Sequence, residues 1–205
     1  MFTGIIEGIG KVLRIEREGT NVHFEIQAPF TSELKIDQSV AHNGVCLTVV
    51  EKNAQSFVVT AIQETLDRTN LGGWTVGCLL YTSDAADESV CVVLGGRLDG
   101  HLVQGHVDST AKLMKVIDAK GSWELHFEHE ASAVNITVPK GSITVNGVSL
   151  TVVNSHPEGF SVAIIPYTWE HTNLGALNTG DPVNLEFDVI GKYVARILAQ
   201  QGLHS

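Results

Sequence analysis

Short runs in which apolar and polar residues alternate follow one another along most of the chain. They are rich in Val, Ile, Phe and Thr, have Gly, Asn or Pro at their ends, and read HFEIQA, SVAHNGVCLTVVE, SFVVTAI, WELHFEH, SITVNGVSLTVVN and FSVAIIP. A period of two places alternate side chains on one buried face, and β-branched and aromatic residues favour strands. The pattern therefore predicts an all-β protein built from short strands.

Two of these runs are copies of each other. Residues 39–50 read SVAHNGVCLTVV and residues 142–153 read SITVNGVSLTVV, which gives eight identities in twelve positions at an offset of 103. At the same offset, IQETLDRTNLG at 62–72 matches IPYTWEHTNLG at 165–175. Two ungapped matches at one offset indicate an internal duplication of a structural unit.

The duplicated unit has the length and the turn signals of a small barrel. TGIIEGIGKV from Thr3 and QGHVDSTAKL from Gln104 match at an offset of 101. Each copy holds an Asn-Gly pair, at 43–44 and 146–147, which favours a tight hairpin turn. Several short strands within roughly 95 residues are typical of a Greek-key barrel. We therefore expect tandem duplicated small Greek-key β-barrels at 1–97 and 98–187, followed by a tail at 188–205.

The tail is the one stretch with helical spacing. In VIGKYVARILAQQG, residues 189–202, the apolar residues Val189, Tyr193, Ile197 and Leu198 fall on one stripe, and Gly202 is a stop signal. A C-terminal helix appended to two complete barrels has few places to bury such a stripe. Packing on its own barrel and self-association are equally compatible with the pattern.

Composition narrows the classes of partner. Hydrophobic residues make up 43% of the 205 positions and charged residues 18%, which is enough apolar surface for a globular core. The net charge of −10, with 13 scattered Lys and Arg, argues against a nucleic-acid binder, because such proteins present a basic patch to the phosphates. A small-molecule ligand is the better expectation.

The cysteines and the N-terminus bear on location. Cys46, Cys78 and Cys91 form an odd set without C-x-x-C spacing, so neither a disulfide framework nor a cysteine zinc site is indicated. Free thiols suit a reducing cytoplasm. The chain has no basic targeting segment and no run of ~18 apolar residues. We expect a cytoplasmic protein without a membrane span.

One His-rich segment invites a metal interpretation. HFEHE carries His126 and His129, but on a strand residues three apart point to opposite faces. We therefore predict no metal site there.

Several motifs, in order and spacing, resemble the riboflavin synthase family over nearly the whole chain: MFTGIIE at the start, NGVCLTV, NGVSLTV, ETLDRTNLG, GHLVQGHVD and KGSITVNG. The resemblance implies a cofactor-free transferase. Its reaction is a dismutation in which two molecules of 6,7-dimethyl-8-ribityllumazine exchange a four-carbon unit to give riboflavin and 5-amino-6-(D-ribitylamino)uracil. A duplicated chain suits this chemistry, because two copies of one molecule need two similar pockets brought together.

The resemblance also implies an assembly. Family members are homotrimers held by their C-terminal helices, and an N-terminal barrel of one subunit faces a C-terminal barrel of another. Neither a metal nor an organic cofactor is expected, and lumazine synthase is a further partner to consider.

Ligand contacts carry over residue by residue from the resemblance. In the first copy they are Gly4, Ile5, Ile6, Cys46, Leu47, Thr48, Thr60, Ala61, Ile62, Gln63, Glu64 and Thr65. In the second copy they are Gly105, His106, Val107, Ser149, Leu150, Thr151, Ala163, Ile164, Ile165, Pro166, Tyr167 and Thr168. Lys140 matches a lysine that reaches a ligand across the subunit boundary.

Four residues are the candidates for chemistry. His106 is suited to proton transfer near pH 7, and Ser39 and Cys46 are the polar or nucleophilic groups of the first copy. The repeat equivalent of Cys46 is Ser149, so a ligand contact is the better interpretation of this thiol. Asp188 matches an acid of the family's site, or caps the tail helix, and both roles are compatible. His101 we assign to structure.

The resemblance stops abruptly at Cys78. Residues 78–94 read CLLYTSDAADESVCVVL, where the second copy has a strand ending in VNLEF. Natural divergence with an acidic loop is one explanation. We favour another, in which residues 78–88 are a foreign insert, because they closely resemble the in-frame translation of a transposon-type sequencing-library adapter. A foreign insert would remove a strand and leave its neighbours with an unpaired edge.

Two other functions stay open. A lumazine protein, the non-catalytic antenna relative, keeps both barrels and only stores a fluorescent ligand; a flavin-storage scaffold would do the same without turnover. Lys140, Ser149, Thr151, His106 and Asp188 are all present, which favours the enzyme.

Overall fold

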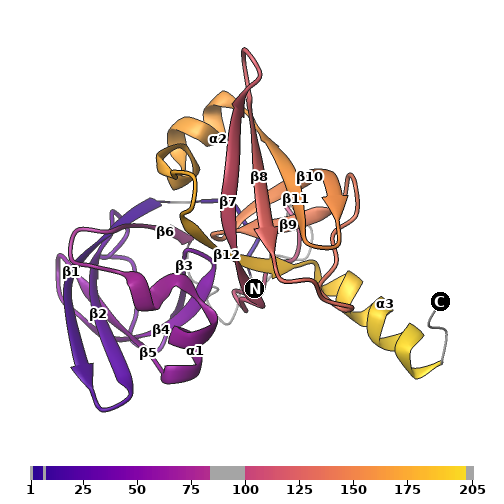
Figure 1. Cartoon of the computed structure of the whole chain (residues 1–205). Helices are drawn as coiled ribbons and strands as arrows, with labels where there is room; N and C mark the ends of the chain where they lie inside the picture. The colour runs from indigo at the N-terminus through magenta and orange to yellow at the C-terminus, as the bar shows by residue number, and fades with distance from the viewer. Residues whose placement is uncertain (1, 7, 84–99, 202–205) are drawn as a thin grey trace, which may run out of the picture.

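Twelve strands form two closed barrels that lie side by side, and a single helix projects from the second of them (Figure 1). The computed structural model describes residues 2–6, 8–83 and 100–201. Within each barrel every strand pairs antiparallel with its neighbours, and each closes on six strands. The predicted class is confirmed: the protein is all-β, built from tandem barrels with a C-terminal helix.

The first barrel follows the order β1-β2-β5-β4-β3-β6. Its elements are β1 (Gly8–Glu18), β2 (Asn21–Gln27), β3 (Ser39–His42), β4 (Val45–Lys52), β5 (Phe57–Ala61), α1 (Gln63–Arg68), the 3-10 turn η1 (Asn70–Gly73) and β6 (Leu79–Ser83). Alternation sets the core: on β2, Val22, Phe24 and Ile26 are buried and their neighbours are less so.

The second barrel follows the order β10-β11-β8-β7-β12-β9. Its elements are β7 (Ser109–Asp118), β8 (Trp123–His129), β9 (Ser142–Val145), β10 (Val148–His156), β11 (Gly159–Ile164), α2 (Pro166–His171), the 3-10 turn η2 (Asn173–Ala176) and β12 (Pro182–Phe187). Each element has its counterpart in the first barrel, as the repeat predicts.

The closing strand of the first barrel is present, so the expectation of a lost strand and an unpaired edge is wrong. β6 pairs with β1, from Gly8–Thr82 to Lys11–Leu79, and with β3. The run Leu79–Ser83 places Leu80 inward, where it is fully buried in the core. β6 therefore closes the ladder in spite of its atypical sequence. Residues 84–94 of the atypical segment lie outside the described residues.

The Asn-Gly turns bring the two barrels together. Asn43 and Gly44 have φ values of 47° and 79°, and Asn146 and Gly147 have 47° and 83°, as the predicted tight turns require. The two turns touch: a Cβ built on either glycine would lie 2.7 Å from the backbone nitrogen of the other. The glycines therefore allow a backbone approach that no other residue permits.

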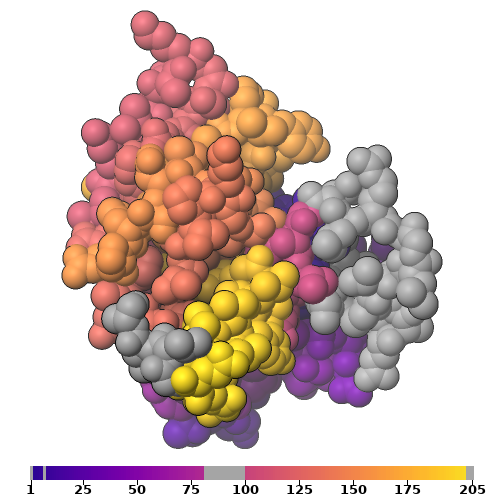
Figure 2. Space-filling model, turned by 90° about the vertical axis from the view of Figure 1, so that its right-hand side faces the viewer, coloured from indigo at the N-terminus to yellow at the C-terminus, as the bar shows by residue number. Residues whose placement is uncertain are grey.

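The helix α3 (Val189–Gln200) leaves the second barrel and buries none of its residues. Figure 2 looks toward this helix and shows its surface uncovered in that view. Of the predicted stripe, Tyr193, Ile197 and Leu198 are 68%, 52% and 42% exposed, so most of it is not covered by its own barrel. Among the described helices, none is long and apolar enough to cross a membrane.

Candidate functional site

Two loops cross from one barrel to the other. The Cys46 amide of the first barrel donates to the Gly105 carbonyl at 2.9 Å, and the Ser149 amide of the second donates to the Gly4 carbonyl at 2.9 Å. Between the loops, Phe2 and Val103 form an isolated antiparallel bridge. Gly4 therefore contacts the second barrel, and Gly105 contacts the first.

This crossing determines which barrel each predicted contact lies beside. Gly4, Ile5 and Ile6 belong to the first copy in sequence, but Ile6 packs on the core of the second barrel. Val107 correspondingly packs on the core of the first. Each candidate site is thus built from one barrel and the crossing loop of the other copy.

Glycine is required at both crossing points. Gly4 and Gly105 have φ values of +76° and +77°, a region that L side chains rarely adopt. A Cβ on Gly4 would lie 2.6 Å from the Cβ of Ser149, and one on Gly105 would lie 2.7 Å from the Cβ of Cys46. The two contacts are equivalent to within 0.1 Å by these figures, so the two sites share one design.

A pocket of about 490 Å³ marks the second of these sites. Its lining joins the crossing loop to the second barrel, and includes Gly4, Ile5, Ile6, Ser149, Tyr167 and Thr168. Tyr167 stacks on His171 with ring centroids 4.1 Å apart. A concave site of this size with an aromatic rim is suited to a small planar ligand.

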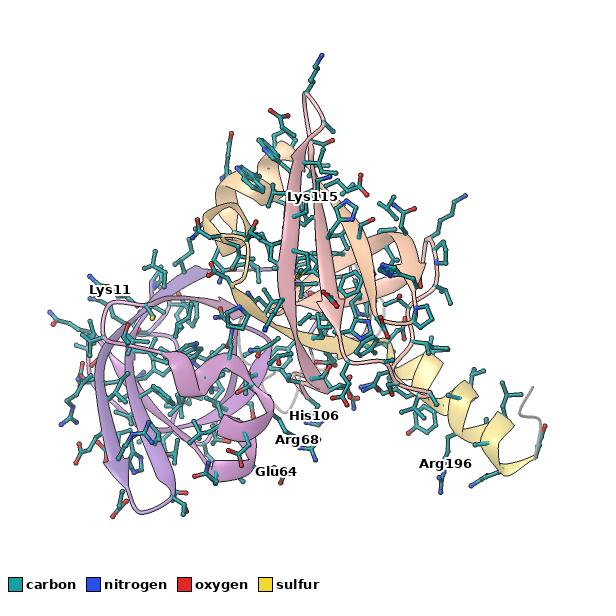
Figure 3. All side chains as sticks on the ribbon, in the orientation of Figure 1. Lys11, Glu64, Arg68, His106, Lys115 and Arg196 are labelled. Atoms are coloured by element: carbon teal, nitrogen blue, oxygen red, sulfur yellow. The ribbon has the colours of Figure 1, made fainter. Side chains whose placement is uncertain are left out.

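The first site gathers the equivalent groups around β4 and α1. Figure 3 shows His106 at the same end of the first barrel as Glu64 and Arg68 of α1; these two form an exposed ion pair at 3.3 Å. His106 is exposed, so its ring is accessible to a ligand. The Thr60 hydroxyl is hydrogen-bonded to His23 Nδ1 at 2.9 Å.

The remaining predicted contacts divide by where their side chains point. Four are buried in the barrel cores, so only their backbone groups can reach a ligand: Leu47, Ala61, Leu150 and Ile164. The others are exposed or half-buried: Thr48, Thr60, Ile62, Gln63, Glu64, Thr65, Thr151, Ala163, Ile165 and Pro166.

The surroundings of the Cys46 thiol disfavour its ionised form. Burial raises its pKa, an effect that the Ser39 hydroxyl opposes through a hydrogen bond. Nucleophilic cysteines need the opposite shift. The structure thus brings Ser39 and Cys46 together, and it supports a contact role for the thiol.

Comparison with known proteins agrees with this arrangement. The lumazine binding domain family matches residues 3–80 and again residues 104–188, one match for each barrel. The riboflavin synthase of Mycobacterium tuberculosis is 41% identical over 208 residues, covering 98% of this chain and 100% of that protein. That of Actinobacillus pleuropneumoniae is 36% identical, covering 98% and 91%.

This chain belongs to the riboflavin synthase family. Solved structures of LumP share the fold: the complex with 6,7-dimethyl-8-(1'-D-ribityl) lumazine has a TM-score of 0.78 at 20% identity, covering 91% of this chain and 98% of that one. The riboflavin complex has a TM-score of 0.80.

One neighbour of the second site was missed by the sequence analysis. His101 is 8% exposed, and its ring bonds to the Ser149 hydroxyl at 2.6 Å and to the Thr144 hydroxyl at 3.1 Å. Burial lowers its pKa, and the charge of Asp188 opposes the shift. The signal was the nearness of His101 to His106 in the motif GHLVQGH, which lies on the crossing loop of this chain.

Asp188 and Lys140 both take part in backbone hydrogen bonds. The Asp188 carboxylate accepts from the Ile190 amide at 3.0 Å and caps α3, so its capping role is confirmed. Lys140 is exposed, with a φ of 67°, and its amide donates to the Val152 carbonyl at 2.8 Å. Within the described residues, no group of three or more His, Cys, Asp or Glu could hold a metal ion.

Proposed function

We propose that this protein is a riboflavin synthase that converts two molecules of 6,7-dimethyl-8-ribityllumazine into riboflavin and 5-amino-6-(D-ribitylamino)uracil. One observation carries the proposal: the chain builds two equivalent sites, each from one barrel and the crossing loop of the other copy. A reaction between two identical molecules needs such a pair of sites. The full-length similarity to riboflavin synthases supports it.

Proximity and orientation are the main catalytic resource in this proposal. The electron-poor ring acidifies the 7-methyl group of one substrate, so a modest base can remove its proton. His106, exposed on the crossing loop at the first site, is our candidate for that base. Strand backbone groups bind the pyrimidinedione edge, and threonine hydroxyls supply further donors and acceptors.

The assembly we propose is a homotrimer without metal or organic cofactor. The uncovered apolar stripe of α3 supports self-association over packing on the barrel. In the trimer, a first barrel of one subunit faces a second barrel of another, and Lys140 reaches a ligand across that boundary. A cytoplasmic location and association with lumazine synthase complete the proposal.

Incubation of the purified protein with 6,7-dimethyl-8-ribityllumazine tests the function directly. We expect riboflavin fluorescence to grow with time. Replacement His106→Asn lowers the rate by about 100-fold, the size expected for loss of a general base. The matched replacement His126→Gln, on β8, leaves the rate unchanged. Binding without any product would contradict the enzyme and support the antenna protein.

A further inference from the structure

One buried carboxylate holds a crossing loop by its backbone. Glu186 of β12 is 3% exposed. Its Oε1 accepts from the Gln104 amide at 2.6 Å, and its Oε2 accepts from the Gly105 and His106 amides at 2.9 and 3.0 Å. Charge-assisted bonds of this kind are about twice as strong as neutral ones.

The loop that Glu186 holds serves the first site. Gly105 receives the Cys46 amide through its carbonyl, and His106 is the candidate base. With three consecutive amides on one carboxylate, the loop has little freedom to leave this geometry.

We propose that Glu186 is a positioning residue for the first site. Its repeat counterpart, Ser83, offers no carboxylate for the same contact at the second site. The proposal deepens the proposed function, since it concerns the geometry of the same sites. The two copies then differ in the chemistry available at this position although their barrels are repeats.

Strand register identifies Ser83 as the equivalent of Glu186. Glu186 pairs with Thr144 of β9, and Ser83 pairs with Ala41 of β3; both offsets are 103. The amides at 104–106 correspond to those at 3–5 by the offset of 101. A serine side chain is two carbons shorter than that of glutamate, and it carries no charge.

Charge around Glu186 links the anchor to pH. Burial raises the pKa of this carboxyl to about 7, an effect that the amide donors and Lys192 oppose and that Asp108 adds to. The charge of Glu186 also raises the pKa of the Cys46 thiol. The carboxylate therefore gains its charge, and strengthens its hold on the loop, as pH rises through 7.

Amide hydrogen exchange tests the anchor without any ligand. In Glu186→Gln we expect the amides at 104–106 to exchange at least about tenfold faster, because three charge-assisted bonds are weakened. In the unchanged protein their protection, corrected for intrinsic rates, increases as pH rises through 7; the variant loses this rise. The control Glu128→Gln, exposed on β8 of the same barrel, alters neither. Unchanged exchange at 104–106 in Glu186→Gln would overturn the proposal.

The reverse substitution, at Ser83, tests the difference between the two copies. Ser83→Glu slows exchange at residues 3–5 by about tenfold and leaves 104–106 unchanged; Gln55→Glu, an exposed site with the same added charge, does neither. This measurement on Ser83→Glu remains possible even if Glu186→Gln does not fold. In turnover of 6,7-dimethyl-8-ribityllumazine, Glu186→Gln raises KM more than it lowers kcat. If neither the unchanged protein nor any variant turned over the substrate while hydrogen exchange behaved as expected, the proposed riboflavin synthase function would be refuted. The positioning role of Glu186 would still stand.

Discussion

His42 is a buried ionisable group whose repeat equivalent is the apolar Val145. It is 0% exposed, and its ring lies 5.7 Å from that of Phe57. Burial lowers its pKa from 6.5 to about 4. His42 therefore binds a proton below pH 6.5 in the unfolded chain, but only below about pH 4 in the folded chain. Folding stability falls as pH decreases through this window.

We expect His42→Val to remove that pH dependence. The loss between pH 6.5 and pH 4 amounts to about 3 kcal/mol. Urea unfolding at both ends of the window measures it, with the exposed His156→Val as control. Glu186, whose raised pKa has the opposite sign, lowers stability as pH rises from 4.5 to about 7, so each variant is compared with the unchanged protein at the same pH. Equal slopes in His42→Val and the unchanged protein would contradict the assignment.

Gly105 is the residue at which the first site is most sensitive to a single methyl group. Gly105→Ala places a Cβ 2.7 Å from that of Cys46 at a φ of +77°. We expect a loss of about 2–4 kcal/mol from overpacking and backbone strain together, measured by urea unfolding. Gly73→Ala is the matched control, because nothing lies within 4 Å of the added methyl. Comparable losses in the two variants would show that the close approach is not responsible.

At the scale of elements, the apolar stripe of α3 is the surface with the clearest consequence. The double variant Ile190→Ser and Ile197→Ser is expected to convert the proposed homotrimer into monomers, because both side chains are more than half exposed in the single chain. Analytical ultracentrifugation gives the mass. Gln200→Ser, at an exposed polar position of the same helix, keeps the assembly. An unchanged mass in the double variant would place the interface elsewhere.

The elements were predictable where alternation and turn chemistry are strong. The strands, the Asn-Gly turns and the terminal helix follow from residue types alone. The crossing of the two loops was not predictable. Alternation of apolar and polar residues indicates which side chains are buried, but it does not indicate which barrel buries them. Ile6 shows this: its position in the first copy is plain, yet it packs on the second core. The β6 strand was missed for a related reason, since one inward Leu80 gives no periodic signal.

At the scale of the whole molecule, Asn184 makes several of the polar contacts between the barrels. Its Oδ1 accepts from the Asn70 amide at 2.7 Å, and its Nδ2 donates to the Asn43 carbonyl and to Asn70 Oδ1, each at 3.0 Å. Asn184→Ala leaves these groups without their partner, so we expect the free energy of unfolding to fall by about 2–4 kcal/mol. Asn178→Ala, in an exposed turn, is the control. A loss below that of the control would contradict this role of Asn184.

The repeat equivalents of these residues are bonded differently: the Asn173 Nδ2 donates to the Asn43 Oδ1 at 3.3 Å. Asn173 is the repeat equivalent of Asn70, and within the described part of the chain its buried Oδ1 has no hydrogen-bond partner. Tyr81, which pairs with Ile9, stands where Asn184 stands in the second copy, paired with Thr110.

The crossed loops bear on how such a chain arose. A single barrel with its own N-terminal loop lacks part of that loop's partner, because Gly4 and Ile6 contact the other copy. Two separate one-barrel molecules could pair about a twofold axis, with the N-terminal loop of each packed on the other. Gly44 of one would then contact Gly44 of the other, as Gly44 contacts Gly147 in this chain. The present protein then has the architecture of a fused dimer, and we expect residues 1–97 expressed alone to pair rather than remain single. Fusion would also free the two halves to diverge, as Glu186 and Ser83 have done.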